Sequence, residues 1–100
     1  MIFYPSGILP EGFFLEEFDM EKRVGVVGIV VEDFENTEKV NSILHDFAKL
    51  IVGRMGIPYR ERDMSVISLI VDGTSDEISS MTGKLGKIPG INVKSAITKK

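Results

Sequence analysis

The residues best suited to binding a ligand lie in the stretch "GRMGIPYRER", which spans positions 53–62. Its three arginines carry planar guanidinium groups that pair with carboxylate and phosphate through parallel hydrogen bonds. Its two glycines follow an apolar helical pattern and would leave backbone amides open to an anion, and its tyrosine offers a stacking face and a hydroxyl. The ligand-binding or interface candidates in this stretch are Gly53, Arg54, Gly56, Tyr59, Arg60 and Arg62.

Two other interpretations of this stretch stand beside ligand binding. Glycine and proline also end helices and begin strands. Arg60 and Arg62 would then alternate with Tyr59 and Glu61 along a sheet edge, where charges oppose aggregation. The stretch would also suit a contact between subunits, because arginine and tyrosine are enriched in interfaces.

A second basic stretch, "GKLGKIPG" at residues 83–90, adds Lys84 as a candidate for holding an anionic group. It lacks the spacing and the Lys-Ser/Thr end of a P-loop, so a helix end followed by a turn is the favoured interpretation. His45 beside Asp46 has the chemistry of a general base. It falls on the polar face of a predicted helix without a nucleophile partner, so we expect it to be exposed to solvent.

The composition excludes several kinds of site. The chain of 100 residues has no cysteine and one histidine, which rules out disulfides, thiolate zinc sites and a multi-histidine metal site within one chain. With no nucleophile, metal cluster or convincing acid–base pair, the sequence predicts neither an enzyme nor a bound metal or cofactor. No apolar run approaches the roughly 20 residues of a membrane span, and no secretory signal is recognisable. We therefore expect a cytoplasmic protein without a membrane partner.

The charge distribution argues against nucleic-acid binding. Residues 1–20 carry four acidic and no basic side chains, and the remaining eighty residues carry eleven acidic and twelve basic ones. The greater part of the chain is therefore nearly neutral, whereas nucleic-acid binding depends on a surplus of lysine and arginine. The strand pattern at 65–73 also lacks aromatic residues on which RNA bases could stack.

The chain divides into two parts of different character. We interpret residues 20–100 as one domain and residues 1–19 as an N-terminal extension. The extension contains two prolines and two glycines and shows no sustained period, whereas a regular pattern begins just after Met20. Two interpretations are open: a tail whose aromatic residues dock on the domain or a neighbour, or a mis-called start upstream of a natural start at Met20.

Hydrophobic patterning predicts the element order β-α-β-β-α-β. Apolar runs with β-branched residues indicate strands, and apolar stripes at helical spacing indicate helices. Right-handed crossovers place both helices on one face of a four-stranded antiparallel sheet, which is the ferredoxin-like α+β sandwich. The predicted ranges are strands at 24–31, 57–62, 65–73 and 91–97, a helix at 37–52 that ends at Gly53 or Gly56, and a second helix capped by Ser75.

Two of the predicted strands are apolar on both faces, over residues 24–31 and 65–71. In the first of them Val24, Val26 and Val30 alternate with Val27, Ile29 and Val31. A strand that is apolar on both sides needs cover on both sides, and the helices cover only one. We therefore predict a homo-oligomer, a dimer or a tetramer, with residues 1–19 as the alternative cover.

Three stretches, "GRMGIPYRER", "SVISLIVDG" and "GKLGKIPGINVKSA", resemble the family of iron-only hydrogenase system regulators, small ACT-like proteins with a ferredoxin-like alpha-beta plait. The resemblance runs from about Lys22 to the C-terminus. It implies a cytoplasmic, homo-oligomeric, non-enzymatic regulator that responds to a small ligand. The alternative is a protein–protein interaction module that acts on a maturation or regulatory partner without a small ligand.

The chain departs from better-understood ACT-like proteins in the loop after the first strand. Amino-acid-binding ACT domains typically have a glycine there, where the effector meets backbone amides. Here the loop is "EDFEN" at 32–36, which is acidic and has no glycine. The resemblance therefore does not extend to an amino-acid effector. ACT-like nickel regulators use several histidines and a cysteine, so no nickel site is implied either.

Overall fold

The computed structural model describes residues 21–99. The predicted extension at 1–19 and the alternative start at Met20 lie outside the described residues. The regular elements are β1 (Lys22–Val31), α1 (Thr37–Asp46), β2 (Ile51–Tyr59), β3 (Met64–Thr74), α2 (Ser75–Gly86) and β4 (Ile91–Ile97). Three short 3-10 turns, η2 (Phe34–Asn36), η3 (Ala48–Leu50) and η4 (Arg60–Arg62), link them.

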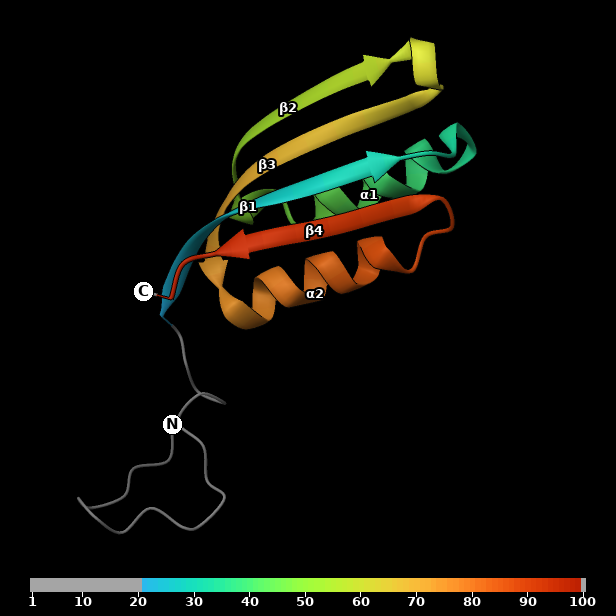
Figure 1. The fold of residues 1–100 in the computed structure, drawn as a ribbon. Coiled ribbons are helices and arrows are strands. Elements are labelled where there is room, and N and C mark those ends of the chain that lie inside the picture. The colour runs from blue at the N-terminus through green and yellow to red at the C-terminus, as the bar shows by residue number, and fades with distance from the viewer. Residues whose placement is uncertain (1–20, 100) are drawn as a thin grey trace, which may run out of the picture.

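The strands form one antiparallel sheet in the order β2-β3-β1-β4. Both helices pack on the same face of this sheet (Figure 1). This arrangement confirms the predicted ferredoxin-like βαββαβ sandwich. Its outer strands, β2 and β4, each have a backbone edge without a partner strand within the described range.

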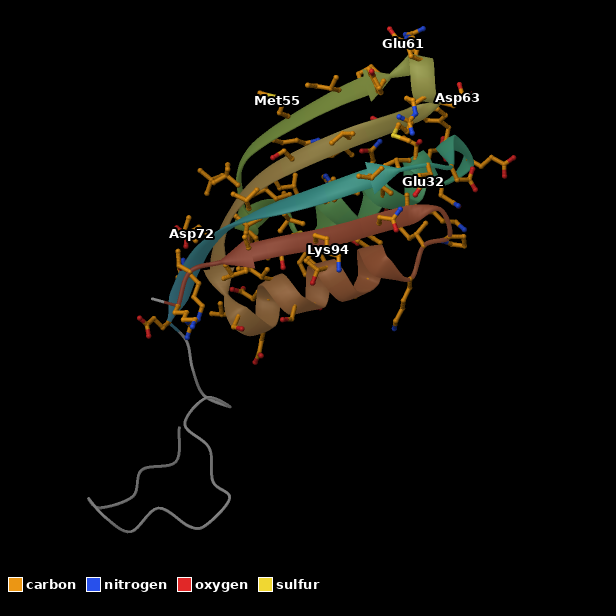
Figure 2. The ribbon with its side chains drawn as sticks, in the orientation of Figure 1. Glu32, Met55, Glu61, Asp63, Asp72 and Lys94 are labelled. Atoms are coloured by element: carbon orange, nitrogen blue, oxygen red, sulfur yellow. The ribbon has the colours of Figure 1, made fainter. Side chains whose placement is uncertain are left out.

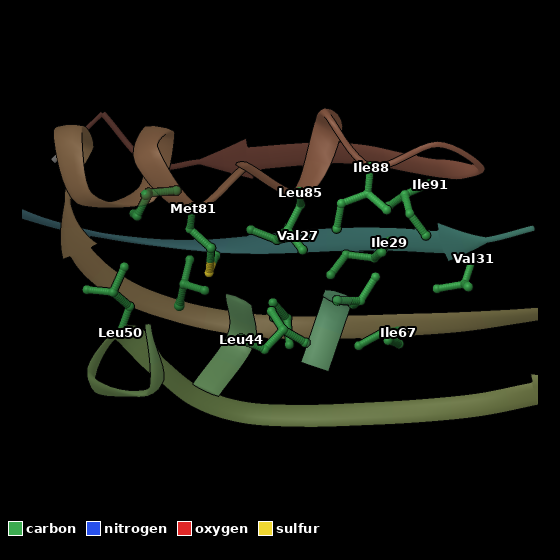
Figure 3. Close-up of a cluster of buried hydrophobic side chains, with 14 residues drawn as sticks. Val27, Ile29, Val31, Leu44, Leu50, Ile67, Met81, Leu85, Ile88 and Ile91 are labelled. Atoms are coloured by element: carbon green, nitrogen blue, oxygen red, sulfur yellow. The ribbon is translucent and has the colours of Figure 1, made fainter. Parts of the chain in front are cut away.

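The core lies between the sheet and the helices (Figure 3). Alternate residues of the central strands β1 and β3 face the helices and are almost completely buried. Each fully buried aliphatic side chain contributes about 1.5–3 kcal/mol to folding. The strands supply Val27, Ile29, Val31, Ile67, Leu69 and Val71, and the helices supply Val40, Leu44, Ile78, Met81 and Leu85.

The remaining alternate residues of β1 and β3 face away from the helices. Val24 and Val26 on β1 are 48% and 44% exposed, and Val66 and Ile70 on β3 are both 41% exposed. The predicted division of these strands into two apolar faces is therefore confirmed, and one of those faces is open in the described chain.

The boundary between α1 and β2 differs from the prediction. The helix ends at Asp46, a 3-10 turn follows at Ala48–Leu50, and β2 begins at Ile51. Gly53 and Gly56 therefore lie inside a strand and do not end a helix. The apolar pattern predicted too long a helix because Leu50 and Ile51 both fall at helical spacing. Leu50, which is 6% exposed, packs into the core from the 3-10 turn, and Ile51 begins a strand.

The predicted edge strand at 57–62 also needs correction. Only its first three residues belong to β2, and Arg60–Arg62 form η4. Asp63 closes this turn in a left-handed conformation at φ 50, and its N–H bonds to the carbonyl of Arg60 at 3.2 Å. Aspartate tolerates that conformation better than most residues do. The arginines therefore sit on a hairpin turn and do not alternate along an edge.

The N-terminus of α2 is capped by Thr74, one residue before the predicted Ser75. Thr74 is the last residue of β3 and keeps an extended backbone, so its hydroxyl accepts the N–H of Glu77 at 3.2 Å. The Glu77 carboxylate in turn accepts the N–H of Thr74 at 2.8 Å. This reciprocal capping box lowers the pKa of Glu77, chiefly through the Thr74 backbone bond.

Within residues 21–99, no helix is long and apolar enough to cross a membrane. The same range contains no group of three or more histidine, cysteine, aspartate or glutamate side chains placed to share a metal ion.

Candidate functional site

A groove of about 420 Å³ lies where α1 and its following turn meet the edge strand β2. The α1 wall presents Asn41, Leu44 and His45 at positions i, i+3 and i+4, which share one helix face, and Ala48 follows from η3. The strand wall presents two residues that point to the same side of the sheet as the helices. The lining residues are Asn41, Leu44, His45, Ala48, Ile51 and Arg54.

Arg54 is the charged residue of this groove. It lies opposite Leu69 of β3, a fully buried core residue, so its side chain leaves the sheet on the helix side. Its Nη2 donates a hydrogen bond to Oδ1 of Asn41 on α1 at 2.8 Å. No carboxylate among the described residues forms an ion pair with it, although a guanidinium carries five N–H donors.

The groove therefore combines one held cation with an apolar floor. Asn41 accepts a hydrogen bond from one edge of the exposed guanidinium, and Leu44, Ala48 and Ile51 line the groove beside it. An arginine fork binds carboxylate in a bidentate geometry. The volume is near the lower end of small-molecule sites, so it suits a small organic acid.

The structure separates Arg54 from the other predicted arginines. Arg60 and Arg62 lie in η4 at the tip of the β2–β3 hairpin, the region that Glu61 and Asp63 mark in Figure 2. Both are exposed. The predicted cluster of three arginines around one anion is therefore not assembled within a single described chain.

The predicted glycines and tyrosine are distributed over both faces of β2. Gly56 pairs with Ile67 on the helix side, whereas Gly53 pairs with Ile70 on the open side. Tyr59 ends the strand opposite Met64 and is 47% exposed. None of the three lines the groove around Arg54.

Lys84 lies on α2, away from that groove. Its Nζ is 5.3 Å from the centroid of the Phe47 ring, which follows α1. This cation–π contact connects α2 to the residue that follows α1 and gives Lys84 a structural role of about 0.5–1 kcal/mol at an exposed site.

The loop after β1 is held by the turn before β4. The N–H of Glu32 bonds to the carbonyl of Gly90 at 2.7 Å, and the Asn36 amide bonds to the carbonyl of Pro89 at 2.9 Å. The Asn92 amide donates to the Glu32 carboxylate. These bonds hold the loop after β1 against the turn before β4.

A second groove, of about 590 Å³, lies between α2 and the edge strand β4. Its helical wall is made of small residues, Ser79, Thr82, Gly83 and Gly86. Its described lining includes Lys94 but no arginine, and the groove beside β2 is the better carboxylate site because arginine supplies paired donors.

Sequence reasoning identified Arg54 and missed its neighbours on α1. His45 was predicted to be exposed on the polar face of the helix and is exposed, as is Asn41. Both nevertheless line the groove. Their four-residue spacing was the available signal, because it places both side chains on one helix face.

Comparison with known proteins identifies the relatives. A family model described as "TM1266-like: Iron-only hydrogenase system regulator, putative" matches residues 23–95. The chain is 39% identical to the solved "uncharacterized protein TM1266" from Thermotoga maritima, with a TM-score of 0.75, over 79% of this chain and 100% of that one. No match was found among the curated proteins.

More distant structures share the fold alone. The ACT domain from GTP pyrophosphokinase of Chlorobium tepidum is 16% identical with a TM-score of 0.59, over 79% of this chain and 89% of that one. A formyltetrahydrofolate deformylase from Pseudomonas putida is 9% identical with a TM-score of 0.54, over 73% of this chain and 28% of that one. The chain thus has an ACT-like fold and belongs to the TM1266-like family of iron-only hydrogenase system regulators.

Proposed function

We propose that this protein is a cytoplasmic, non-enzymatic regulator that senses a small organic acid in the groove between α1 and β2. The family description supports a regulatory role in the iron-only hydrogenase system. The ligand class follows from Arg54, which supplies paired donors for a carboxylate.

The observation that carries this proposal is the environment of the Arg54 guanidinium. Asn41 holds it through a bond of 2.8 Å, while no described carboxylate neutralises it. A surface arginine without a role is free to adopt many rotamers, so anchoring it beside an apolar floor prepares it for an anion. The core around Leu44 and Leu69 fixes both walls of the groove.

Nuclear magnetic resonance tests this function directly. Uniformly ¹⁵N-labelled full-length protein is titrated with a panel of sodium carboxylates, from formate to succinate, against sodium chloride at equal ionic strength. We expect saturable amide shifts for at least one carboxylate, centred on Asn41, Ala48 and Arg54. Shifts that never saturate, or that appear equally with chloride, would remove the support for an organic-acid sensor.

A second candidate function is an interaction module that binds a maturation or regulatory protein without a small ligand. The specific observation in its favour is the set of exposed apolar side chains on the open face of the sheet. Stoichiometric co-purification of a host protein, together with a carboxylate titration that gives no shifts, would favour this second function.

A further inference from the structure

We propose that the open face of the sheet is an interface that binds a second copy of this chain, with the two sheets packed face to face. The open face is the surface opposite the helices, formed by Val24, Val26, Met55, Ile57, Tyr59, Val66 and Ile70 around Gly28 and Ser68. This inference rests on the strands themselves and does not depend on the proposed ligand.

The size of the apolar surface fits a stable dimer. The seven large side chains are each 41–63% exposed, so together they present roughly 600 Å² of apolar area. That is the upper end of what a monomer exposes. A standard interface takes about 800 Å² from each partner, of which about 65% is apolar in homodimers. The open face therefore supplies the apolar part of one such interface.

The form of the surface fits a sheet better than a peptide or a small ligand. The face is a broad four-stranded surface without a covering helix (Figure 1). Both grooves described above border a helix. Two sheets of the same twist pack face to face at about −30° and about 10 Å apart. A second copy presents a sheet with that same twist.

Gly28 marks the centre of this surface. It lies on β1 opposite Ser68 of β3 and Lys94 of β4. A Cβ at this position would meet only the Lys94 carbonyl, at 3.9 Å, so packing within the chain does not require glycine. A glycine inside a strand weakens it and often marks a place where another backbone or side chain approaches closely.

The same row contains a matching projection. Met55 on β2 pairs with Ser68 and is 63% exposed, the largest exposed fraction on the open face. A two-fold axis along β3, between the sheets, places Met55 of each copy over Gly28 of the other. A surface that carries both a projection and its hollow is self-complementary, as a two-fold interface requires.

Charged side chains lie beside this contact, on the edge strand and toward one end of the sheet. Lys94 lies on the edge strand β4, and Asp72 lies toward the far end of β3; Figure 2 shows both away from Met55. In the proposed arrangement β4 extends beyond the partner's β2, so Lys94 remains in water. The open face thus has an apolar centre and a polar rim, which is the usual anatomy of an interface.

Sedimentation equilibrium of the full-length chain tests the proposal. We expect a dimer whose dissociation constant rises at least about 100-fold in Val26→Glu, because the dimer would bury an unpaired carboxylate. Gly28→Val, which fills the hollow, should weaken the dimer at least about tenfold without lowering the melting temperature of the monomer. The matched control is Ser80→Glu, on the exposed side of α2, which should change the constant less than about twofold.

Four results would overturn the proposal. One is a monomer at every concentration. Another is a dimer that Val26→Glu leaves intact, which would place the contact away from the open face. A third is a monomeric full-length chain that dimerises when it begins at Met20, which would assign the cover to residues 1–19. The fourth is Gly28→Val with unchanged association, which would remove the hollow from the interface.

Discussion

Arg54 is the residue on which the proposed function depends most. Its replacement by glutamine removes the positive charge while keeping hydrogen-bonding capacity toward Asn41. Charge-assisted hydrogen bonds contribute about 1.5–3 kcal/mol, so we expect carboxylate affinity to fall roughly 10- to 150-fold in the titration described above. Arg54→Lys should recover part of the affinity because it restores charge without the fork.

Arg62→Gln is the matched control for that prediction. It is the same substitution in the same sequence stretch, at an exposed position on the hairpin turn. Affinity should change less than about twofold. An equal loss in both variants would mean that binding follows net charge and not the groove.

The Glu77 carboxylate predicts that the stability of the fold depends on pH. Its pKa is lowered in the folded protein by the hydrogen bonds from the backbone and side chain of Thr74. A carboxyl group with a lowered folded pKa stabilises the protein above its unfolded pKa, and that stabilisation is lost as the pH falls through the folded pKa. Glu77→Gln should therefore be less stable than the wild type at neutral pH, and the difference should vanish at low pH.

Urea unfolding of both proteins between neutral pH and about pH 3 measures this convergence. Thr74→Ala, which removes the other half of the capping box, should cost about 1 kcal/mol at neutral pH. A gap between the wild type and Glu77→Gln that stays constant over the whole range would contradict the assigned role of the ionised carboxylate.

At the scale of elements, two glycines that look alike in sequence have opposite roles. Gly83 lies inside α2, and a Cβ there would meet nothing within 4 Å. Gly25 lies on β1, where a Cβ would come within 2.7 Å of the Ala96 carbonyl and would also overlap the Ile97 side chain. The first glycine weakens a helix without a packing reason, and the second permits β4 to lie against β1.

Alanine substitutions should therefore change stability in opposite directions. We expect Gly83→Ala to stabilise the fold by up to about 1 kcal/mol. Gly25→Ala should destabilise it by about 1–3 kcal/mol, because backbone must move. Thermal and urea unfolding of the two variants beside the wild type measure both effects. Gly83 lines the groove between α2 and β4. If Gly83→Ala destabilised the protein, the space beside Gly83 in that groove would be occupied in the native protein.

The helices and strands also show how far the sequence could predict this structure. Strands β1, β3 and β4 and the buried stripe of α2 were predicted because runs of β-branched apolar residues and helical spacing are strong local signals. The predicted end of α1 was wrong because Phe47, Leu50 and Ile51 continue a helical spacing through a tight turn. No local pattern distinguishes that case, since pairing with β3 decides it.

The candidate site was predictable only in part for a related reason. A stretch of sequence shows which residues could bind an anion, and Arg54 was among those candidates. It does not show where a strand ends, so Arg60 and Arg62 were grouped with Arg54, although they lie in the hairpin turn η4. Asn41 comes from another element, and only the packing of α1 against β2 brings it to the guanidinium.

At the scale of the whole molecule, the fold keeps two potential functions apart. The groove at Arg54 lies on the helix side of the sheet, and the proposed interface covers the opposite side. A dimer formed through the open face would therefore leave both grooves accessible. It would also leave the edges of β2 and β4 available for a larger assembly, such as a tetramer.

Native mass spectrometry of gently purified full-length protein tests the central claim, organic-acid sensing at Arg54, most directly. Wild type and Arg54→Gln are incubated with the same carboxylate panel and measured side by side. We expect the wild type to retain one small organic acid per chain and the variant to lose it, with an unchanged number of subunits. A wild-type protein with only the mass of its chains, after incubation with every member of the panel, would contradict the claim.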